Sequence, residues 1–197
     1  MSNLTHPQGE PILAVDRIRK IARELFYKEG IRAVGVDEIV SKAGVTKPSL
    51  YRSFSSKDEL AAAYLRDYDG EFWVRFEKSA AAHPGDPKAQ ILDYIRGLGQ
   101  RAQRDDYRGC GLSNAALEYP DHDHPARKVS EDHKQRLRTR LTEMAKGMGA
   151  KRPEVLADGL LLLIEGVFVT GQLFGDGGPA MHAAEIAETM IDASRKA

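Results

Sequence analysis

A short segment of this chain combines basic, hydroxyl and aromatic side chains in a pattern that suits contacts with nucleic acid. The segment, AGVTKPSLYRSFSSKDEL, covers residues 43–60. Between Lys42 and Lys57 four side chains are basic and none is acidic. Basic and hydroxyl groups donate many of the hydrogen bonds that proteins make to phosphate, and some of them also read base edges. These residue types predict a nucleic-acid-binding surface, provided that one element presents them together.

The charge of the chain is distributed unevenly. Its 197 residues carry 29 Lys+Arg and 29 Asp+Glu, so the formal net charge is zero, which by itself argues against a nucleic-acid partner. Residues 1–57 hold 10 Lys+Arg against 6 Asp+Glu, a net charge of +4, and residues 58–197 hold 19 against 23, a net charge of −4. Only the first part therefore has a charge that suits phosphate.

The composition indicates a globular, cytoplasmic protein. Hydrophobic residues make up 42% of the chain and charged residues 29%, as in ordinary folded domains. The single cysteine excludes an internal disulfide and suits a reducing cytosol. The N-terminal segment lacks a basic start followed by an apolar core, so we expect no signal peptide. The longest apolar stretch, 160–164, is far too short to cross a bilayer, so we expect no membrane partner.

Hydrophobic residues recur at helical spacing, and no segment alternates as a strand would. An apolar stripe that starts at Ile18 predicts an amphipathic helix ending at Gly30. A second helix is expected after Gly35, with Gly44 as its end. Thr46 is expected to cap a short third helix.

Glycine, proline and capping residues divide the rest of the chain. Ser56 and Glu59 form a capping-box pattern that predicts the start of a long fourth helix. A further helix is predicted to start at Pro87 after the break at 83–87, and the segment 107–125 is predicted to hold one short helix. The last three helices are predicted to start at Pro125, Pro153 and Pro179. We therefore expect an all-α fold of about nine helices.

The second and third predicted helices form a helix-turn-helix pattern. Gly44 in the turn allows the left-handed backbone that lets the third helix cross the second steeply. Apolar residues such as Ile39 and Leu50 would face inward. The outward side chains of the third helix are then Thr46, Lys47, Ser49, Tyr51, Arg52 and Ser53. Such a face suits docking in the major groove, and the alternative is a solvated charged face on an ordinary helical bundle.

The segment GIRAVGVDEIVSKAGVTKPSLYRSFSSKDELAAAYL, residues 30–65, resembles the DNA-binding region of TetR/AcrR-type transcriptional regulators. The resemblance covers roughly the first third of the chain without a gap. It implies an N-terminal helix-turn-helix DNA-binding domain at 1–56. It also implies a C-terminal helical domain for effector binding and dimerisation at 57–197.

The resemblance implies roles for single residues of the third helix. Lys47 and Ser49 take base-reading positions, with Thr46 nearby. Pro48 lies where its ring would meet a thymine methyl group. The positions that hold the phosphate backbone are those of Tyr51, Ser53 and Lys57.

Two residues depart from the family's pattern. Gly35 stands where the family often has a capping Thr or Ser that touches phosphate, which leaves only backbone N–H donors. Ser53 stands where an aromatic residue or His is common, and its reach is shorter. Both departures predict modest DNA affinity with an unchanged binding mode.

The helix predicted over 153–175 is apolar around much of its circumference, more than a small domain needs to bury. Gly166 and Gly171 would permit close approach of another helix. With the last helix, this element is expected to form the homodimer interface that the resemblance implies. The alternative is a central helix buried within a monomer.

The resemblance also implies an effector pocket among the middle helices, and aromatic side chains there suit a small organic ligand. The candidates are Phe72, Trp73, Phe76, Tyr94, Leu98, Tyr107 and Phe168, with Asn114, Glu118 and Glu165 as polar anchors. For each of the apolar candidates taken singly, core packing is the alternative. Glu165 is either a ligand-facing acid or a residue at the rim of the dimer.

The segment EYPDHDHPARKVSEDH contains potential metal ligands, namely Glu118, Asp121, His122, Asp123, His124 and His133. His122 and His124 are two residues apart and do not share a helix face, and no cysteine pair accompanies them. We therefore expect a polar turn and no metal site. Cys110 could sense redox state, although a lone thiol is usually just buried.

These features predict a ligand-responsive transcriptional regulator, most simply a repressor, that binds double-stranded DNA. It would bind a pseudo-palindromic operator as a homodimer and be released by a small, uncharged or weakly polar organic effector. The chain has no phosphate-binding glycine loop, Gly-x-Ser-x-Gly or His-Glu-x-x-His motif, so we expect no enzyme, no catalytic residue and no cofactor. The alternatives are a protein of this fold that binds small molecules but not DNA, and a regulator that senses metal or redox state.

Overall fold

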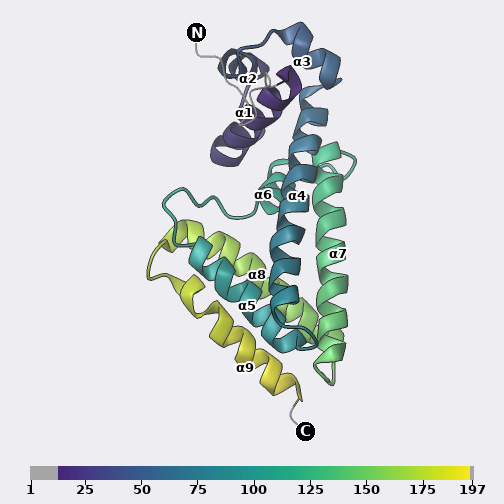
Figure 1. The fold of residues 1–197 in the computed structure, drawn as a ribbon, viewed down its shortest axis with the longest axis vertical. Helices are drawn as coiled ribbons and strands as arrows, with labels where there is room; N and C mark the ends of the chain where they lie inside the picture. Colours follow the sequence, from purple (N-terminus) through teal and green to yellow (C-terminus); the bar gives the residue numbers. More distant parts are fainter. Residues whose placement is uncertain (1–12, 196–197) are drawn as a thin grey trace. The chain divides into compact units, whose positions relative to one another are not determined.

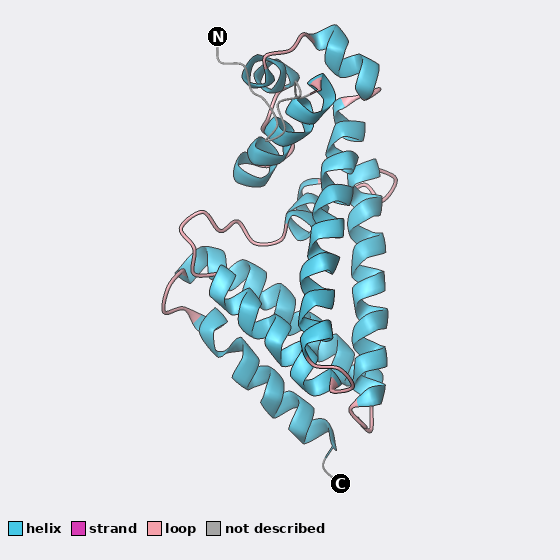
Figure 2. Ribbon diagram, in the orientation of Figure 1, coloured by secondary structure: helices cyan, strands magenta, loops and turns pink. Residues whose placement is uncertain are grey.

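The structure is a computed structural model that describes residues 13–195. Over this range the chain forms nine α-helices and one short 3-10 helix and contains no strand (Figure 2). This confirms the all-α fold. None of the helices within 13–195 combines the length and apolar character needed to cross a membrane. The expectation of no signal peptide rests largely on residues 1–12, which lie outside the described range.

The chain divides into two compact units. The first comprises the residues up to Asp67 together with Asn114–Val129, and the second comprises Tyr68–Ser113 and the residues from Ser130 onward. The functional domains expected at 1–56 and 57–197 remain a prediction, because compactness does not test where DNA or an effector binds.

Three helices run from one unit into the other. They are α4 (Lys57–Ala82), α6 (Gly111–Glu118) and α7 (Pro125–Gly147). Each is a single element of sequence, so the boundary between the units falls inside continuous helices.

The first unit is built around α1 (Ala14–Glu29), α2 (Val36–Ala43) and α3 (Lys47–Ser53), which pack against one another (Figure 1). The buried side chains in these helices are Ile18, Ala22, Leu25, Phe26, Ile39, Val40, Ala43 and Leu50. The predicted apolar stripe of the first helix therefore faces the core, and α1 ends before Gly30 as predicted.

Gly44 forms the turn between α2 and α3. Its backbone is left-handed, with φ 62° and ψ 41°, a conformation that glycine adopts without steric cost. The Gly44 N–H donates to the Ser41 carbonyl, and the Val45 N–H donates to the Val40 carbonyl at 3.0 Å. These bonds close the end of α2, and α3 starts at Lys47, two residues after Val45. The predicted helix-turn-helix is confirmed.

Two consecutive serines cap α4. The Glu59 N–H donates to Ser56 Oγ at 3.1 Å, as the capping-box pattern predicts. The Glu59 carboxylate accepts hydrogen bonds from the Ser55 hydroxyl and backbone N–H, at 2.5 and 2.6 Å, and not from Ser56. These hydrogen bonds lower the pKa of Glu59. The Glu59 side chain therefore completes the capping box at Ser55, one residue earlier than predicted.

In the second unit α5 (Pro87–Arg101), α8 (Pro153–Phe174) and α9 (Ala183–Arg195) pack side by side (Figure 1). Pro179 does not open the last helix as predicted. It begins the 3-10 turn η1 (Pro179–His182), and α9 starts at Ala183. A Cβ at Gly99 would lie 2.6 Å from the Ala180 carbonyl oxygen, so the backbone of this turn rests directly on α5.

The two glycines of α8 that were expected to admit a partner helix have different surroundings. A Cβ at Gly171 would lie 2.7 Å from Ala102 Cβ and from Tyr107 Cε1, so this chain already occupies that side of the helix. A Cβ at Gly166 would meet nothing within 4 Å. The close approach at Gly171 is therefore made by residues of this chain, and the approach of another helix at Gly166 stays a prediction.

Candidate nucleic-acid interface and cationic pocket

Helix α3 is held by one buried side chain and presents the others to solvent. Leu50 is fully buried, and the Ser49 N–H donates to the Thr46 hydroxyl at the start of the helix, at 3.4 Å. Ser49 itself is half-buried, and Tyr51 is 49% exposed. The other exposed residues of the predicted face are Thr46, Lys47, Pro48, Arg52 and Ser53. The structure therefore gathers the predicted residues of this helix on one short surface element.

Intramolecular contacts hold two of the cations on this helix. Lys47 Nζ lies 2.7 Å from Asp37 Oδ1 of α2, and the hydrogen bond to Asp37 raises the pKa of Lys47. Arg52 Nη2 donates to Ser49 Oγ at 2.8 Å. Both basic groups remain exposed and keep further N–H donors for a partner.

Lys57, at the start of α4, reaches the loop before α2. Its Nζ donates to the Arg32 carbonyl at 3.3 Å, and partial burial lowers the pKa of Lys57. Gly35 caps the start of α2 with an extended backbone and no side-chain hydrogen bond. Lys57 and the start of α2 both belong to the first unit, and their contact with phosphate stays a prediction.

The structure gives Glu118 different neighbours from those predicted. Its carboxylate accepts a hydrogen bond from the Arg32 backbone N–H at 2.8 Å, and its carbonyl accepts one from the Arg32 guanidinium at 3.3 Å. Glu118 and Asn114 both fall in the first unit, whereas the aromatic candidates fall in the second. Glu118 thus joins the end of α6 to the loop after α1, and the contacts do not group it with the aromatic side chains.

Four of the predicted aromatic residues do cluster in the second unit. The ring centroids of Phe72 and Phe76 are 6.1 Å apart, and those of Phe76 and Tyr94 are 4.8 Å apart. Trp73 lies against Phe72 at 5.5 Å. Phe72, Phe76 and Tyr94 are at most 3% exposed. The rings touch one another directly, so these side chains pack together in the second unit, and their role in ligand binding stays a prediction.

His133 belongs to this cluster, although only the metal reading of the sequence considered it. Its ring is fully buried at 4.5 Å from Phe72, and its Nδ1 lies 2.7 Å from Asp69 Oδ1. Burial, together with the neighbouring Lys134, lowers the pKa of His133 to about 4. The imidazole is therefore neutral near pH 7 and donates from Nδ1 to Asp69. The sequence carries little sign of this role. His133 lies three residues after Ser130, which is also buried.

Asp69 is held by two donors. Burial acts to raise the pKa of Asp69, but hydrogen bonds from His133 and Arg136 outweigh burial and lower it. The ring nitrogens His133 Nε2 and Trp73 Nε1 are buried without a hydrogen-bond partner in the described part of the chain.

Glu165 is the partner of Lys134. Lys134 Nζ lies 2.5 Å from Glu165 Oε1, and the Ser113 hydroxyl donates to Glu165 Oε2 at 2.7 Å. The same ammonium group lies 5.3 Å from the Phe168 ring centroid and 3.8 Å from Cys110 Sγ. The structure therefore places Glu165 in a half-buried polar network, which supports neither of its two predicted roles by itself. Cys110 is fully buried.

The remaining apolar candidates are packed within this chain, and their role in ligand binding stays a prediction. Leu98 is 2% exposed on α5, and the Tyr107 ring lies against the Gly171 backbone. The histidines of the predicted polar turn are also separated: His124 stacks on Tyr119 at 3.7 Å in the first unit, whereas His133 is in the second. Among residues 13–195 no group of three or more His, Cys, Asp or Glu side chains is arranged to hold a metal ion.

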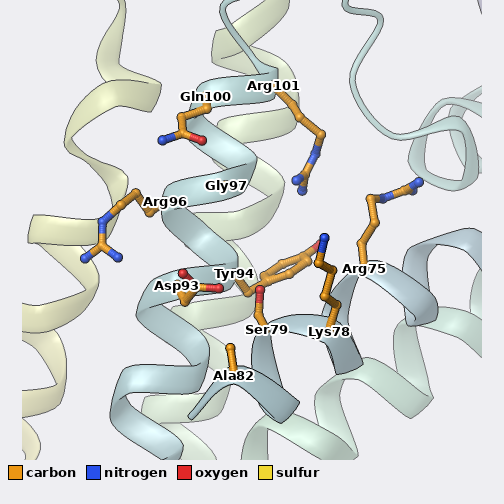
Figure 3. A pocket seen from close by; sticks show the side chains of 10 residues that line it. All are labelled: Arg75, Lys78, Ser79, Ala82, Asp93, Tyr94, Arg96, Gly97, Gln100 and Arg101. Atoms are coloured by element: carbon orange, nitrogen blue, oxygen red, sulfur yellow. The ribbon is translucent and has the colours of Figure 1, made fainter.

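A cavity of about 360 Å³ lies between α4 and α5 (Figure 3). Its lining residues are Arg75, Lys78, Ser79, Ala82, Asp93, Tyr94, Arg96, Gly97, Gln100 and Arg101. Four of these are cationic and one is acidic. Tyr94 is the one predicted ligand-binding residue among them. The lining of this cavity is cationic, unlike that of the uncharged, aromatic pocket predicted from the sequence, which stays a prediction.

Helix α8 carries an exposed apolar stripe. Val155, Leu162, Val169 and Leu173 are 52%, 73%, 52% and 72% exposed, respectively. Their spacing of seven, seven and four residues places them on one face of the helix, and Gly166 lies on the same face. Ile186 of α9 is also exposed, at 44%.

The fold and the exposed α3 define an all-helical protein with a helix-turn-helix unit. Residues 18–64 match the family described as bacterial regulatory proteins, tetR family. A crystal structure of SCO4454, a TetR-family transcriptional regulator from Streptomyces coelicolor, has 29% identity and a TM-score of 0.85, covering 93% of this chain and 96% of the other. A putative tetR transcriptional regulator from Streptomyces avermitilis has 28% identity and a TM-score of 0.80, covering 94% and 100%. Residues 18–64 are therefore a tetR-family segment, and over most of its length the chain resembles solved TetR-family regulators.

Curated relatives match over shorter segments. The transcriptional activator FasR of Mycolicibacterium smegmatis is 53% identical over 45 residues, 23% of this chain and 20% of FasR. The transcriptional repressor KstR2 of the same organism is 26% identical over 129 residues, 66% of this chain and 54% of KstR2. The chain thus spans about a fifth and about half of these two relatives.

Proposed function

We propose that this chain is a transcriptional regulator that binds double-stranded DNA through α3. The observation that carries the proposal is the arrangement of α3, which Leu50 anchors to the core while its cationic and hydroxyl side chains remain exposed. A helix with such a face suits the major groove, where side chains near its N-terminus meet base edges. The tetR-family segment and the names of the relatives support the same function.

The side chains divide by position into base contacts and phosphate contacts. Lys47 and Ser49 would read bases, with Thr46 and Pro48 beside them. Tyr51, Arg52, Ser53 and Lys57 would hold phosphate, joined by the backbone N–H groups near Gly35 at the start of α2. Lys57 already reaches the loop before α2, so the two phosphate-binding elements lie together.

The protein is proposed to act as a homodimer through α8 and α9. The apolar stripe of α8 exposes large side chains that a partner would cover, and Gly166 leaves room for the partner's backbone. A two-fold dimer presents two copies of α3 to two half-sites, which is the arrangement that a pseudo-palindromic operator requires.

A small molecule bound in the second unit would act on DNA binding through α4. This helix begins at Lys57 and continues to the cavity residue Lys78, 21 residues or roughly 30 Å further along. A ligand that binds the DNA-free arrangement more tightly lowers operator affinity, and by linkage the operator lowers ligand affinity by the same factor. Repression relieved by the ligand is the simplest outcome. Such a regulator works in the cytoplasm and needs neither catalysis nor a cofactor.

The proposal is tested with the full-length chain and fluorescent duplexes from the genomic region around its own gene. We expect saturable binding to one fragment that weakens steeply as salt rises, because released counterions drive the association. Equal, weak binding to all fragments would contradict operator recognition. It would favour the alternative of a TetR-fold protein that binds small molecules only.

A further inference from the structure

We propose that the cavity between α4 and α5 binds a small organic anion whose carboxylate or phosphate oxygens are held by Lys78 and Arg101. The inference rests on the proposed function only in naming the anion as the class of effector. The binding site itself is tested without DNA.

The positive charge around the cavity is only partly neutralised by the protein. The cavity is lined by Arg75, Lys78, Arg96 and Arg101 against the single acid Asp93. Asp93 lies 3.9 Å from the His83 ring, and Arg75 makes a contact of 3.5 Å with Glu71. Over residues 13–195, Lys78, Arg96 and Arg101 have no carboxylate within ion-pair distance. Clustered cations repel one another, so an anion would be stabilised by all of them.

Arg101 is a partly buried cation that a bound anion would stabilise. Its guanidinium lies over the Tyr94 ring, 5.9 Å from the centroid, and the side chain is only half-exposed. Burial lowers the pKa of Arg101, and the nearby Arg75 acts in the same direction. A charge that is partly removed from water without a counterion is costly, and a bound carboxylate or phosphate would offset that cost with two parallel hydrogen bonds.

Two of the cationic side chains point to the same part of the cavity. Figure 3 shows Lys78 of α4 and Arg101 of α5 extending toward one another beside Tyr94, with the Ser79 hydroxyl also directed to the ring. Arg75 and Arg96 extend away from that part of the cavity, so they contribute positive potential more than direct contacts. The site thus offers an ammonium group, a guanidinium and a hydroxyl to a single oxyanion.

The size of the cavity limits the ligand. A volume of about 360 Å³ is near the lower end for small-molecule pockets, which suits a single ring or short chain bearing the anionic group. Tyr94 and Ala82 supply apolar surface for the body of the ligand. Gly97 adds no side chain to the wall, so a larger residue at this position would fill the space.

The test is isothermal titration calorimetry of the full-length chain with benzoate, phenyl phosphate and the neutral benzamide. We expect saturable binding of at least one anion, with benzamide at least about 10-fold weaker, since hydrogen bonds to charged groups contribute roughly that much or more. The better of the two anions identifies the head group as carboxylate or phosphate.

Variants locate the binding to this cavity. Lys78→Gln and Arg101→Gln should each weaken anion binding roughly 10- to 100-fold. Gly97→Leu should block it without changing any charge. Arg104→Gln, which removes the same charge from an exposed residue outside the lining, should bind as the native chain does.

Three results would overturn the proposal. They are no saturable binding of either anion in the millimolar range, equal binding of benzamide, or native affinity in both the Lys78→Gln and Arg101→Gln variants. Anion binding that persists in a protein unable to bind DNA would refute the proposed function and leave this site standing. DNA binding without anion binding would refute the anion site and leave the proposed function intact.

Discussion

Lys47 Nζ lies 2.7 Å from Asp37 Oδ1, so α2 holds the amine of α3 that we propose reads bases. The two side chains are 52% and 81% exposed, and exposed ion pairs are weak and screened by salt. The pair therefore orients Lys47 at little cost, and DNA would replace Asp37 with an acceptor of its own.

Removing the acid should strengthen DNA binding. In Asp37→Asn the competing carboxylate is lost, and one negative charge near the phosphates disappears with it. We expect a severalfold gain in affinity for all duplexes, measured by fluorescence anisotropy. Glu24→Gln removes an equal charge from an exposed position of α1 and is the control. An unchanged affinity in Asp37→Asn would place Lys47 outside the interface.

Two lysines should have separable effects on DNA binding. Lys57→Ala should weaken binding to specific and random duplexes alike and reduce the salt slope by about 1, as for loss of one phosphate contact. Lys47→Ala should also relax base preference, by roughly 1–3 kcal/mol of discrimination at one position. If both variants lose affinity equally on specific and random duplexes, the proposed division of roles is incorrect.

The apolar stripe of α8 should hold the dimer. Leu162→Glu combined with Val169→Glu places two charges on that stripe. Sedimentation should then report a monomer, whereas we expect the native chain to sediment as a dimer. Val74→Glu is the matched control, because Val74 is 72% exposed on α4 and lies outside α8 and α9. A double variant that still sediments as a dimer would move the interface elsewhere.

Burial of His133 should make stability depend on pH. The unfolded chain protonates this imidazole near pH 6.5, whereas the folded chain does so only near pH 4. Between these values the unfolded state binds more protons, so the free energy of unfolding should fall as pH falls, by about 3 kcal/mol at most. Above pH 6.5 the titration of His133 no longer changes the free energy of unfolding with pH. Asp69, whose pKa is lowered, adds loss of the same sign at still lower pH.

Urea unfolding at several pH values between 7 and 4.5 measures this slope. His133→Asn cannot titrate and should flatten the slope even if it lowers overall stability. His182→Asn changes a histidine whose side chain is 71% exposed and should leave the slope unchanged. An equal slope in the native chain and in His133→Asn would show that His133 is not the group responsible.

Local signals account for what the sequence predicted well. Gly44 ends α2 through its own backbone preference, and Thr46 caps α3 with a side chain three residues from its partner. The contacts that the sequence did not predict are long-range pairs. Glu118 meets Arg32 across 86 positions, and nothing near either residue announces the contact. The cationic cavity was hidden because Lys78 and Arg101 lie on different helices in a part of the chain with net negative charge.

The most direct test of DNA recognition is selection from a randomised duplex library with the purified full-length chain, followed by sequencing. We expect enrichment of an inverted repeat whose half-sites are spaced by a multiple of roughly 10 base pairs, with two chains bound per duplex by native mass spectrometry. An unenriched library, or enriched sequences without two-fold symmetry that bind a single chain, would contradict the proposed dimeric operator binding through α3.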